Sequence, residues 1–290
     1  MKNISVCSWS YRKAVKDVAA EMRAIGVDHI QLALTPFIDP KAVVPGAAGE
    51  TSGGGGETDP VDVQRRQVEE LLASGEWTLC SSMFNSAYED YTTLETIRRT
   101  GGIMPDEHWD ENRSLIVAAA KLSAEWRAPY MMLHAGFMDE SDPAAYAKFT
   151  DRVKFIRDTC GENGVGLILE TGQERPEHLA EFLSKNDGIY VNLDPANIIL
   201  YGMGEAVPAV MTLAPWIRHL HIKDARYAAA PGTWGEEVPW GDGQVDAPAF
   251  LKAVDEIGFT GYGAVEREAG NDRAGDIALA VKRIREGFAA

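Results

Sequence analysis

The sequence predicts an α/β fold of the closed (β/α)8 TIM-barrel type, formed as a single domain over residues 1–290. The first observation behind this prediction is a strict alternation of short apolar runs with amphipathic helical patterns, which indicates a parallel sheet. The second is the number of runs, eight in a chain of 290 residues, which matches such a barrel. The predicted strands are ISVCSW (4–9), HIQLAL (29–34), WTLCSS (77–82), YMMLHA (130–135), GLILET (166–171), IYVNLD (189–194), IRHLHI (217–222) and GYGAVE (261–266).

Helical patterns and loops fill the intervals between these runs. AVKDVAAEMRAIG, after the first strand, ends on Gly26, and glycine commonly follows a helix C-terminus. DPAAYAKFTDRVKFIRDTCGENG, after the fourth, opens with aspartate and proline, as many helices do. Two loops are long, residues 35–60 and residues 225–246. Both follow strands, so both belong to the barrel face that carries the chemistry in this fold.

A doubly wound open sheet is the alternative architecture for the same alternation. That fold usually carries a glycine fingerprint directly after its first strand. Here the first strand leads into SWSYRKAV, which contains no glycine. We therefore favour the barrel.

Composition and charge restrict the classes of partner. The chain has 44 acidic and 28 basic residues and a formal net charge of −16, which repels phosphate backbones and anionic membranes. No apolar run is long enough for a membrane span or a secretory signal. The three cysteines show no disulfide spacing. We expect a cytoplasmic protein with free thiols that binds neither nucleic acid nor membranes.

Four consecutive strands end in side chains that commonly bind metals. We call these residues the quartet: Glu170, Asp194, His221 and Glu266. Because the strand ends of a barrel meet at one mouth, three carboxylates would share a semi-buried cup with an imidazole, and the carboxylates would repel one another. A divalent cation removes that repulsion. This donor set, with room for further oxygen ligands, predicts one ion per chain, with Mn²⁺ preferred and Mg²⁺, Co²⁺ or Zn²⁺ as alternatives.

The segment HLHIKDA (219–225) contains two histidines at different depths along the predicted strand. Side chains alternate along a strand, so His219, His221 and Lys223 face the barrel interior together. His221 lies nearer the mouth and is the better metal ligand. His219 lies one layer deeper, where we expect a hydrogen-bonded core residue.

Six motifs occur in a fixed order: MMLHAGF, LILETGQE, VNLDPANIILYG, HLHIKDA, WGEEVPWGDGQVD and VEREAG. With them the chain resembles the xylose-isomerase-like barrels, which include sugar isomerases, ketose 3-epimerases, inosose dehydratases and endonuclease IV. The last five motifs are similar to the sugar phosphate isomerase/epimerase group. In the ketose epimerases the metal ligands match the quartet, and the two matching glutamates, Glu170 and Glu266, act as acid and base.

The resemblance implies a metal-dependent isomerase or epimerase acting on a keto-sugar or related polyol through a metal-stabilised cis-enediolate. Glu170 and Glu266 come from strands three apart, so they can approach a carbon from opposite faces and invert it. Return of the proton to the adjacent carbon gives isomerisation. Loss of a β-substituent, as in an inosose dehydratase or a 3-keto-glycoside lyase, is the alternative. We expect a carbohydrate or cyclitol as the substrate. The chain could also form a homodimer or homotetramer.

Five further residues are candidates for substrate binding: His134, Asn197, Lys223, Arg226 and Trp234. Asn197 stands where the ketose epimerases have histidine, and Arg226 follows His221 by five residues where their arginine follows by six. Lys223 could act as a general acid, or it could form an ion pair with Asp224 or with a core carboxylate. We favour the ion pair. Aromatic residues near the mouth could form an apolar wall: Trp9, Phe84, Trp234 and Trp240.

The endonuclease branch of the same superfamily is the least favoured interpretation. Its members need additional histidines after several strands. His134 matches one of them, but Asn197 and the segment GDGQVD supply none of the others. With the strong negative charge as well, we do not expect a DNA repair enzyme.

Overall fold

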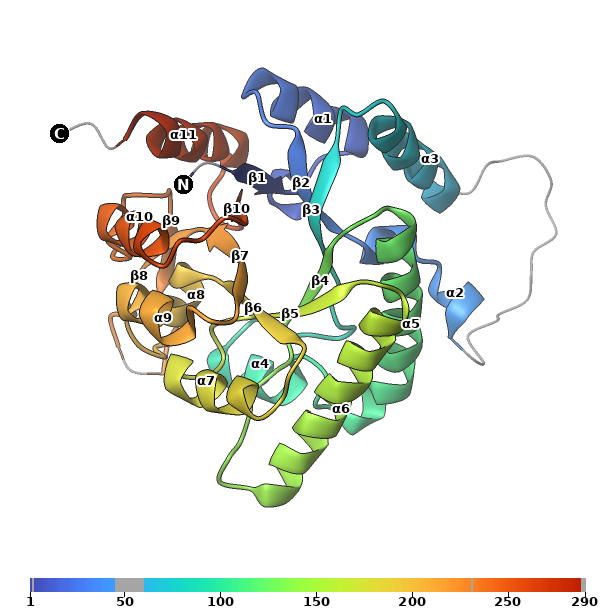
Figure 1. Cartoon of the computed structure of the whole chain (residues 1–290), viewed down its shortest axis with the longest axis vertical. Coiled ribbons are helices and arrows are strands. Elements are labelled where there is room, and N and C mark those ends of the chain that lie inside the picture. Colours follow the sequence, from blue (N-terminus) through green and yellow to red (C-terminus); the bar gives the residue numbers. More distant parts are fainter. Residues whose placement is uncertain (2, 45–59, 231, 288–290) are drawn as a thin grey trace.

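Eight parallel strands close into a barrel in the computed structural model, which describes residues 1, 3–44, 60–230 and 232–287 (Figure 1). The barrel strands are β1 (Ile4–Cys7), β2 (His29–Ala33), β3 (Thr78–Met83), β4 (Tyr130–Leu133), β5 (Gly166–Glu170), β6 (Ile189–Leu193), β7 (Ile217–Ile222) and β10 (Tyr262–Val265). Successive strands pair in parallel, and β10 closes the ring on β1, with Ile4 opposite Gly263. The predicted closed barrel is confirmed, and the open-sheet alternative is wrong.

Helices surround this ring, as Figure 1 shows. They are α1 (Val15–Ala24), α2 (Pro40–Val43), α3 (Pro60–Ala73), α4 (Leu94–Thr100), α5 (Trp109–Glu125), α6 (Pro143–Glu162), α7 (Pro176–Ser184), α8 (Pro195–Leu200), α9 (Ala206–Leu213), α10 (Ala247–Glu256) and α11 (Arg273–Glu286), with 3-10 turns at η1 (Ser8–Tyr11), η2 (Thr35–Phe37) and η3 (Asp106–His108). Gly26 follows α1 with φ of 62°, and Asp142 caps α6, as the sequence predicted. Most of the predicted loop 35–60 lies outside the described residues.

The apolar core lies between the strands and the helices, whereas the inside of the barrel is largely polar. Residues that face outward from the strands, such as Leu32, Val191 and Leu220, pack on the helices. A polar group inside a barrel needs a hydrogen-bond partner there. The buried polar side chains of the interior include Gln31, Ser81, Asn192, His219 and His221. Several of them bond one another, as His219 does with Asn192 and His221 with Gln31.

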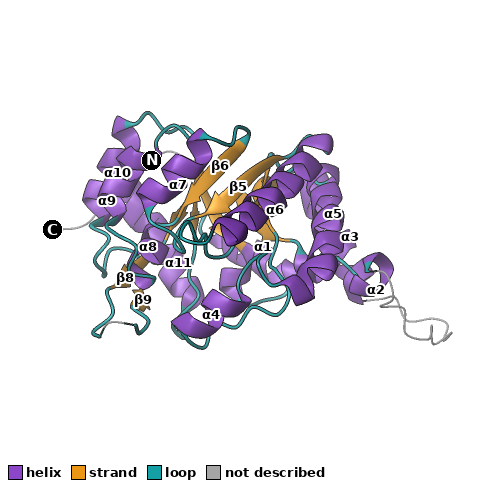
Figure 2. Ribbon diagram, turned by 90° about the horizontal axis from the view of Figure 1, so that it is seen from below, coloured by secondary structure: helices purple, strands orange, loops and turns teal. Residues whose placement is uncertain are grey.

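The carboxyl ends of the strands carry the additional structure. A two-stranded antiparallel sheet, β8 (Asp224–Arg226) with β9 (Glu236–Val238), follows β7, and α4 follows β3. Figure 2 shows α4 and this small sheet at the same end of the barrel. Asp224 anchors the small sheet, because its carboxylate accepts hydrogen bonds from the main-chain N–H groups of Gly241, Gly243 and Val245.

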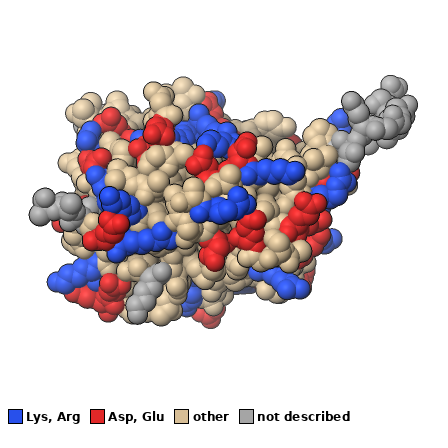
Figure 3. Space-filling model, turned by 90° about the horizontal axis from the view of Figure 1, so that it is seen from above, with Lys and Arg blue, Asp and Glu red and all other residues tan. Residues whose placement is uncertain are grey.

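Acidic and basic side chains are interspersed on the face shown in Figure 3. That face therefore offers no extended patch of one sign. Among the described residues, no helix combines the length and the apolar character that a membrane crossing requires.

Candidate metal centre and its cavity

The quartet meets at the carboxyl end of the barrel. Glu170 is the last residue of β5, Asp194 follows β6 as the N-cap of α8, His221 lies in β7, and Glu266 follows β10. One ligand atom from each lies within 4.8 Å of the other three, and all four side chains are buried. The local structure places them because each stands where a strand ends and a loop or helix begins. The convergence expected from the sequence is therefore present.

The Nδ1 atom of His221 is the centre of this arrangement. It lies 2.8 Å from Glu170 Oε1, 3.3 Å from Asp194 Oδ2 and 3.2 Å from Glu266 Oε2. A ring nitrogen carries at most one hydrogen, so it cannot satisfy three carboxylates by hydrogen bonding. Three carboxylate oxygens and one imidazole nitrogen directed at one point fit a divalent cation, because they supply the donors that such an ion prefers.

Burial disfavours the charged forms of the quartet, but its negative and positive groups stabilise one another. Burial by itself lowers the pKa of His221, but the carboxylates of Glu266 and Glu170 outweigh it and hold the value well above its ordinary range. Burial likewise opposes ionisation of Glu170, yet His134 and His221 lower its pKa well below normal. Glu170 thus favours its ionised form beside positive charge, as a carboxylate that binds a cation does.

His219 has a different environment one layer deeper. Its Nδ1 lies 2.8 Å from Asn192 Oδ1, and its Nε2 lies 3.2 Å from Ser81 Oγ and 3.4 Å from Cys80 Sγ. Burial lowers its pKa well below the ordinary value, so the ring is neutral. His219 is a hydrogen-bonded core residue, as the alternation of the strand predicted.

The two glutamates of the quartet are each held by neighbours. Glu170 Oε2 lies 3.0 Å from His134 Nε2, and Glu170 Oε1 accepts a hydrogen bond of 3.2 Å from Asn197 Nδ2. Glu266 Oε1 accepts a hydrogen bond of 2.7 Å from Trp9 Nε1. Burial alone lowers the pKa of His134, but Glu170 outweighs it and raises the value to about 9. Both carboxylates are therefore fixed in orientation.

Lys223 is buried among carboxylates. Its ammonium group lies 2.8 Å from Glu266 Oε2 and 2.7 Å from Glu268 Oε2. The role favoured from the sequence is an ion pair with Asp224 or with a core carboxylate. The pair with a core carboxylate is present, whereas Asp224 instead accepts hydrogen bonds from the main chain of the loop beyond β9.

The remaining candidates separate into two groups. Trp234 lines the cavity at the mouth and packs edge-on against Tyr201, with ring centroids 4.9 Å apart. Arg226 does not line that cavity, because its guanidinium bonds Glu236 Oε2 and the carbonyl of Asp242. Of the expected aromatic wall, Trp9 and Trp234 line the cavity, whereas Phe84 and Trp240 are buried elsewhere.

The cavity beside the quartet has a volume of about 490 Å³. Its polar and charged lining comes mainly from loops that follow β3, β7 and β10. The sequence did not single out several of its lining residues: Tyr91, Tyr201, Glu237 and Glu268. Tyr91 lies in a loop and Tyr201 in the turn that follows α8, so neither shows a periodic signal, although Tyr201 is the last residue but one of the motif VNLDPANIILYG.

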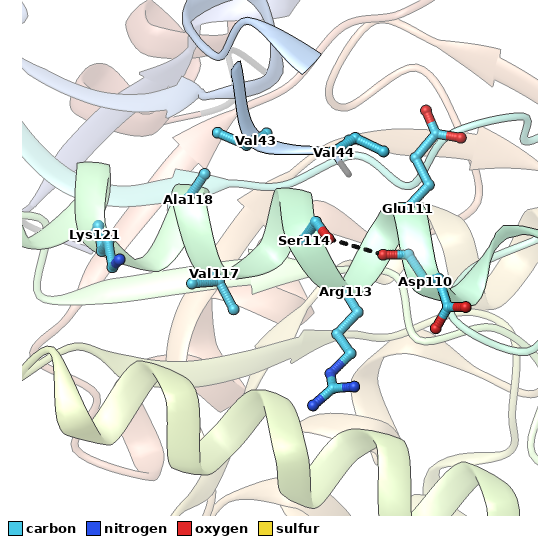
Figure 4. Close-up of a pocket in the computed structure, with 9 residues that line it drawn as sticks. All are labelled: Val43, Val44, Asp110, Glu111, Arg113, Ser114, Val117, Ala118 and Lys121. Carbon is cyan, nitrogen blue, oxygen red and sulfur yellow. Dashed lines mark hydrogen bonds between the residues drawn. The ribbon is translucent and has the colours of Figure 1, made fainter. Parts of the chain in front are cut away.

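A larger hollow of about 700 Å³ lies outside the barrel, between the end of α2 and α5 (Figure 4). Val43 and Val44 face a helix surface that carries Arg113, Ser114 and Lys121. None of its lining residues is buried, and none of them belongs to a barrel strand or to the quartet. We therefore place the functional site at the barrel mouth.

The fold is a TIM barrel and the buried quartet is a candidate metal site; the sequence shows the family. Residues 19–287 match the model of the family described as xylose isomerase-like TIM barrel, and the chain belongs to this family. No curated protein matches the sequence significantly.

Solved structures share the fold over nearly the whole chain. A xylose isomerase domain protein from Planctomyces limnophilus is 24% identical, with a TM-score of 0.79 and coverage of 98% of this chain and 95% of that one. The probable 3-DHS dehydratase AsbF from Bacillus anthracis is 18% identical, with a TM-score of 0.70 and 98% of each chain covered. A xylose isomerase-like protein from Mycobacterium smegmatis, in complex with magnesium, is 18% identical, with a TM-score of 0.67 and coverage of 98% and 96%. Other similar structures are described as epimerases.

Proposed function

We propose that the protein is a divalent-metal-dependent isomerase or epimerase of an uncharged keto-sugar or related polyol, and that residues 1–290 form one domain. The observation that supports this most strongly is the convergence of the quartet beside a cavity. The quartet would hold the ion, for which we propose Mn²⁺. When bound, such an ion would supply Lewis-acid polarisation of a carbonyl and a neighbouring hydroxyl oxygen.

Glu170 and Glu266 would move the proton. Glu170 ends β5 and Glu266 follows β10, and β6 and β7 separate these two strands in the ring, so the two glutamates reach the cavity from different sides. One carboxylate would take the proton from the carbon beside the carbonyl, and the other would return a proton from the opposite side. That exchange inverts the carbon. Delivery to the neighbouring carbon would instead interconvert an aldose and a ketose.

The charges of the cavity support an uncharged substrate. Glu237, Glu268 and the two glutamates of the quartet line it. Lys223, the one lysine among its described lining residues, already forms ion pairs with Glu266 and Glu268. A phosphorylated sugar would bring two further negative charges to this surface without a free cation to bind them.

The loops after the last barrel strands support the same conclusion. In barrels these loops and a helix N-terminus near them commonly hold phosphate. Here a carboxylate already occupies the N-terminus of α11, where a phosphate would bind. Asp272 caps the helix and accepts a hydrogen bond of 3.0 Å from Gly275 N–H. The indole rings of Trp9 and Trp234 are a better fit for the apolar face of an uncharged sugar ring than for a phosphate group.

A lyase acting on the same substrate class is the second candidate. Lys223 supports it, because its ammonium group borders the cavity 2.8 Å from Glu266 and could protonate a departing hydroxyl or glycosyloxy group. The likeness in fold to a probable dehydratase from Bacillus anthracis is consistent with this alternative.

Solvent deuterium exchange tests the proposal. Protein stripped with EDTA and reloaded with Mn²⁺ is incubated in D₂O with free ketoses, inososes and 3-keto-glycosides. We expect deuterium at the carbon beside the carbonyl, even in poor substrates, and no exchange in EDTA. The product then separates an epimer, an isomer and an unsaturated sugar. Cleavage of an abasic DNA duplex, with every sugar unexchanged, would contradict the proposal.

A further inference from the structure

The other ring nitrogen of His221 contacts a residue outside the quartet. His221 Nε2 lies 2.7 Å from the carboxamide oxygen of Gln31, which comes from β2 on another part of the ring. Both side chains are completely buried. The contact therefore joins the quartet to the barrel interior in a place that water does not reach.

Two sulfur atoms determine which end of the Gln31 carboxamide faces His221. Gln31 Nε2 donates to Met132 Sδ at 3.2 Å, and a thioether can only accept. Gln31 Oε1 accepts from Cys7 Sγ at 3.4 Å, and a thiol can donate. The reverse orientation would set the amide N–H₂ against the thiol and leave the thioether facing an oxygen. The oxygen therefore faces both Cys7 and His221.

An amide oxygen accepts hydrogen bonds only, so the ring nitrogen opposite it must carry the hydrogen. A cation binds the ring only in its neutral form, which has one N–H, and if that hydrogen is on Nε2 then Nδ1 presents the lone pair. Nδ1 is the atom that lies 2.8 Å from Glu170 Oε1 and 3.2 Å from Glu266 Oε2. A lone pair among carboxylate oxygens completes a set of donors for a cation.

We propose that Gln31 is a positioning residue that holds His221 in the Nε2–H tautomer and so makes Nδ1 the ligand atom of the metal centre. Cys7 and Met132 act one step further out by fixing the carboxamide of Gln31. The inference rests on the metal centre proposed above. Partners of this kind orient a metal-bound histidine and typically change metal affinity about 10- to 100-fold when they are removed.

Nitrogen NMR of the ion-loaded protein tests the tautomer without any variant in the barrel. The protein is labelled with ¹⁵N-histidine and loaded with diamagnetic Zn²⁺ or Mg²⁺. The His221 signals are assigned by their loss in His221→Asn. We expect the ring proton on Nε2 and a Nδ1 that carries none. A proton on Nδ1 would overturn the inference.

Metal affinity tests the role of the contact. Gln31→Leu removes the acceptor oxygen, so we expect Mn²⁺ affinity, measured by calorimetry, to fall about 10- to 100-fold. Gln31→Glu keeps an acceptor in the same place and should retain the affinity. Asn192→Leu is the matched control, because it removes the same kind of amide–imidazole contact at His219, 2.8 Å long and one layer deeper. It should destabilise the fold but leave metal affinity unchanged.

The outcomes separate this inference from the proposed function. Unchanged affinity in Gln31→Leu, or an equal loss in Asn192→Leu, would overturn the positioning role while the metal centre stands. If the unmutated protein binds no divalent ion, both the metal centre and this inference fail. Should Gln31→Leu not fold, the tautomer measured in the unmutated protein decides.

Discussion

The ammonium group of Lys223 lies 2.8 Å from Glu266 Oε2, and both side chains are buried at the mouth of the barrel. Lys223 follows the strand that carries His221, and Glu266 is itself a proposed metal ligand, so the ion pair links two parts of the quartet. Removal of one partner leaves the other charge buried without compensation, which typically costs about 3–5 kcal/mol. The pair therefore has consequences for both stability and turnover.

Lys223→Met should lower the free energy of unfolding by about 3 kcal/mol and reduce kcat at least tenfold, because Glu266 loses the cation that orients it. Urea denaturation and steady-state kinetics measure the two effects. Lys252→Met is the control, since the exposed pair of Lys252 with Glu256, 3.5 Å apart, should contribute almost nothing. Equal effects of the two substitutions would contradict the prediction.

Glu170→Gln and Glu266→Gln should each abolish turnover while the fold persists. Each change removes a proton-transfer group and one negative charge from the proposed metal site. Turnover and deuterium exchange measure the loss, and circular dichroism checks the fold. The exposed Glu177→Gln should behave as the unmutated protein does. Near-normal exchange in either quartet variant would remove that glutamate from the acid–base pair.

His221→Ala should lower metal occupancy much more than His219→Ala, because only His221 Nδ1 meets the three carboxylates. His219→Ala should instead chiefly reduce stability, since it leaves Asn192 and Ser81 without their partner. Elemental analysis and thermal denaturation separate the two effects. The opposite ranking of metal content would place the metal one layer deeper in the barrel.

Glu174 should give the protein a measurable pH dependence of stability. Burial raises its pKa from 4.5 to about 8. Between these values the folded chain holds a proton that the unfolded chain has released, so the free energy of unfolding falls as the pH rises. In Glu174→Gln this decline between about pH 4.5 and 8 should be shallower than in the unmutated protein. Glu177→Gln, at an exposed position, is the control and should not alter the slope.

The sequence by itself determined the barrel and the positions of the quartet. Both follow from local patterns. Eight apolar runs, each with a helical pattern after it, are enough to specify a parallel ring. A carboxylate or imidazole at the end of a buried run must lie at the carboxyl edge of the sheet. The ranking of His221 above His219 has the same origin, because the two-residue period of a strand fixes depth as well as direction.

Only the tertiary structure decided which other side chains reach the quartet. Gln31 is 190 positions from His221, and Trp9 is 257 positions from Glu266, yet both pairs form hydrogen bonds. Closure of the ring brings them together, and no pattern within a single strand contains that information. Arg226 shows the reverse case, since its place in the sequence suggested the cavity but the β8–β9 pairing turns it to Glu236. The position of a residue at a strand end determines which edge of the barrel its side chain occupies. The strands across the barrel determine which other side chains it contacts there.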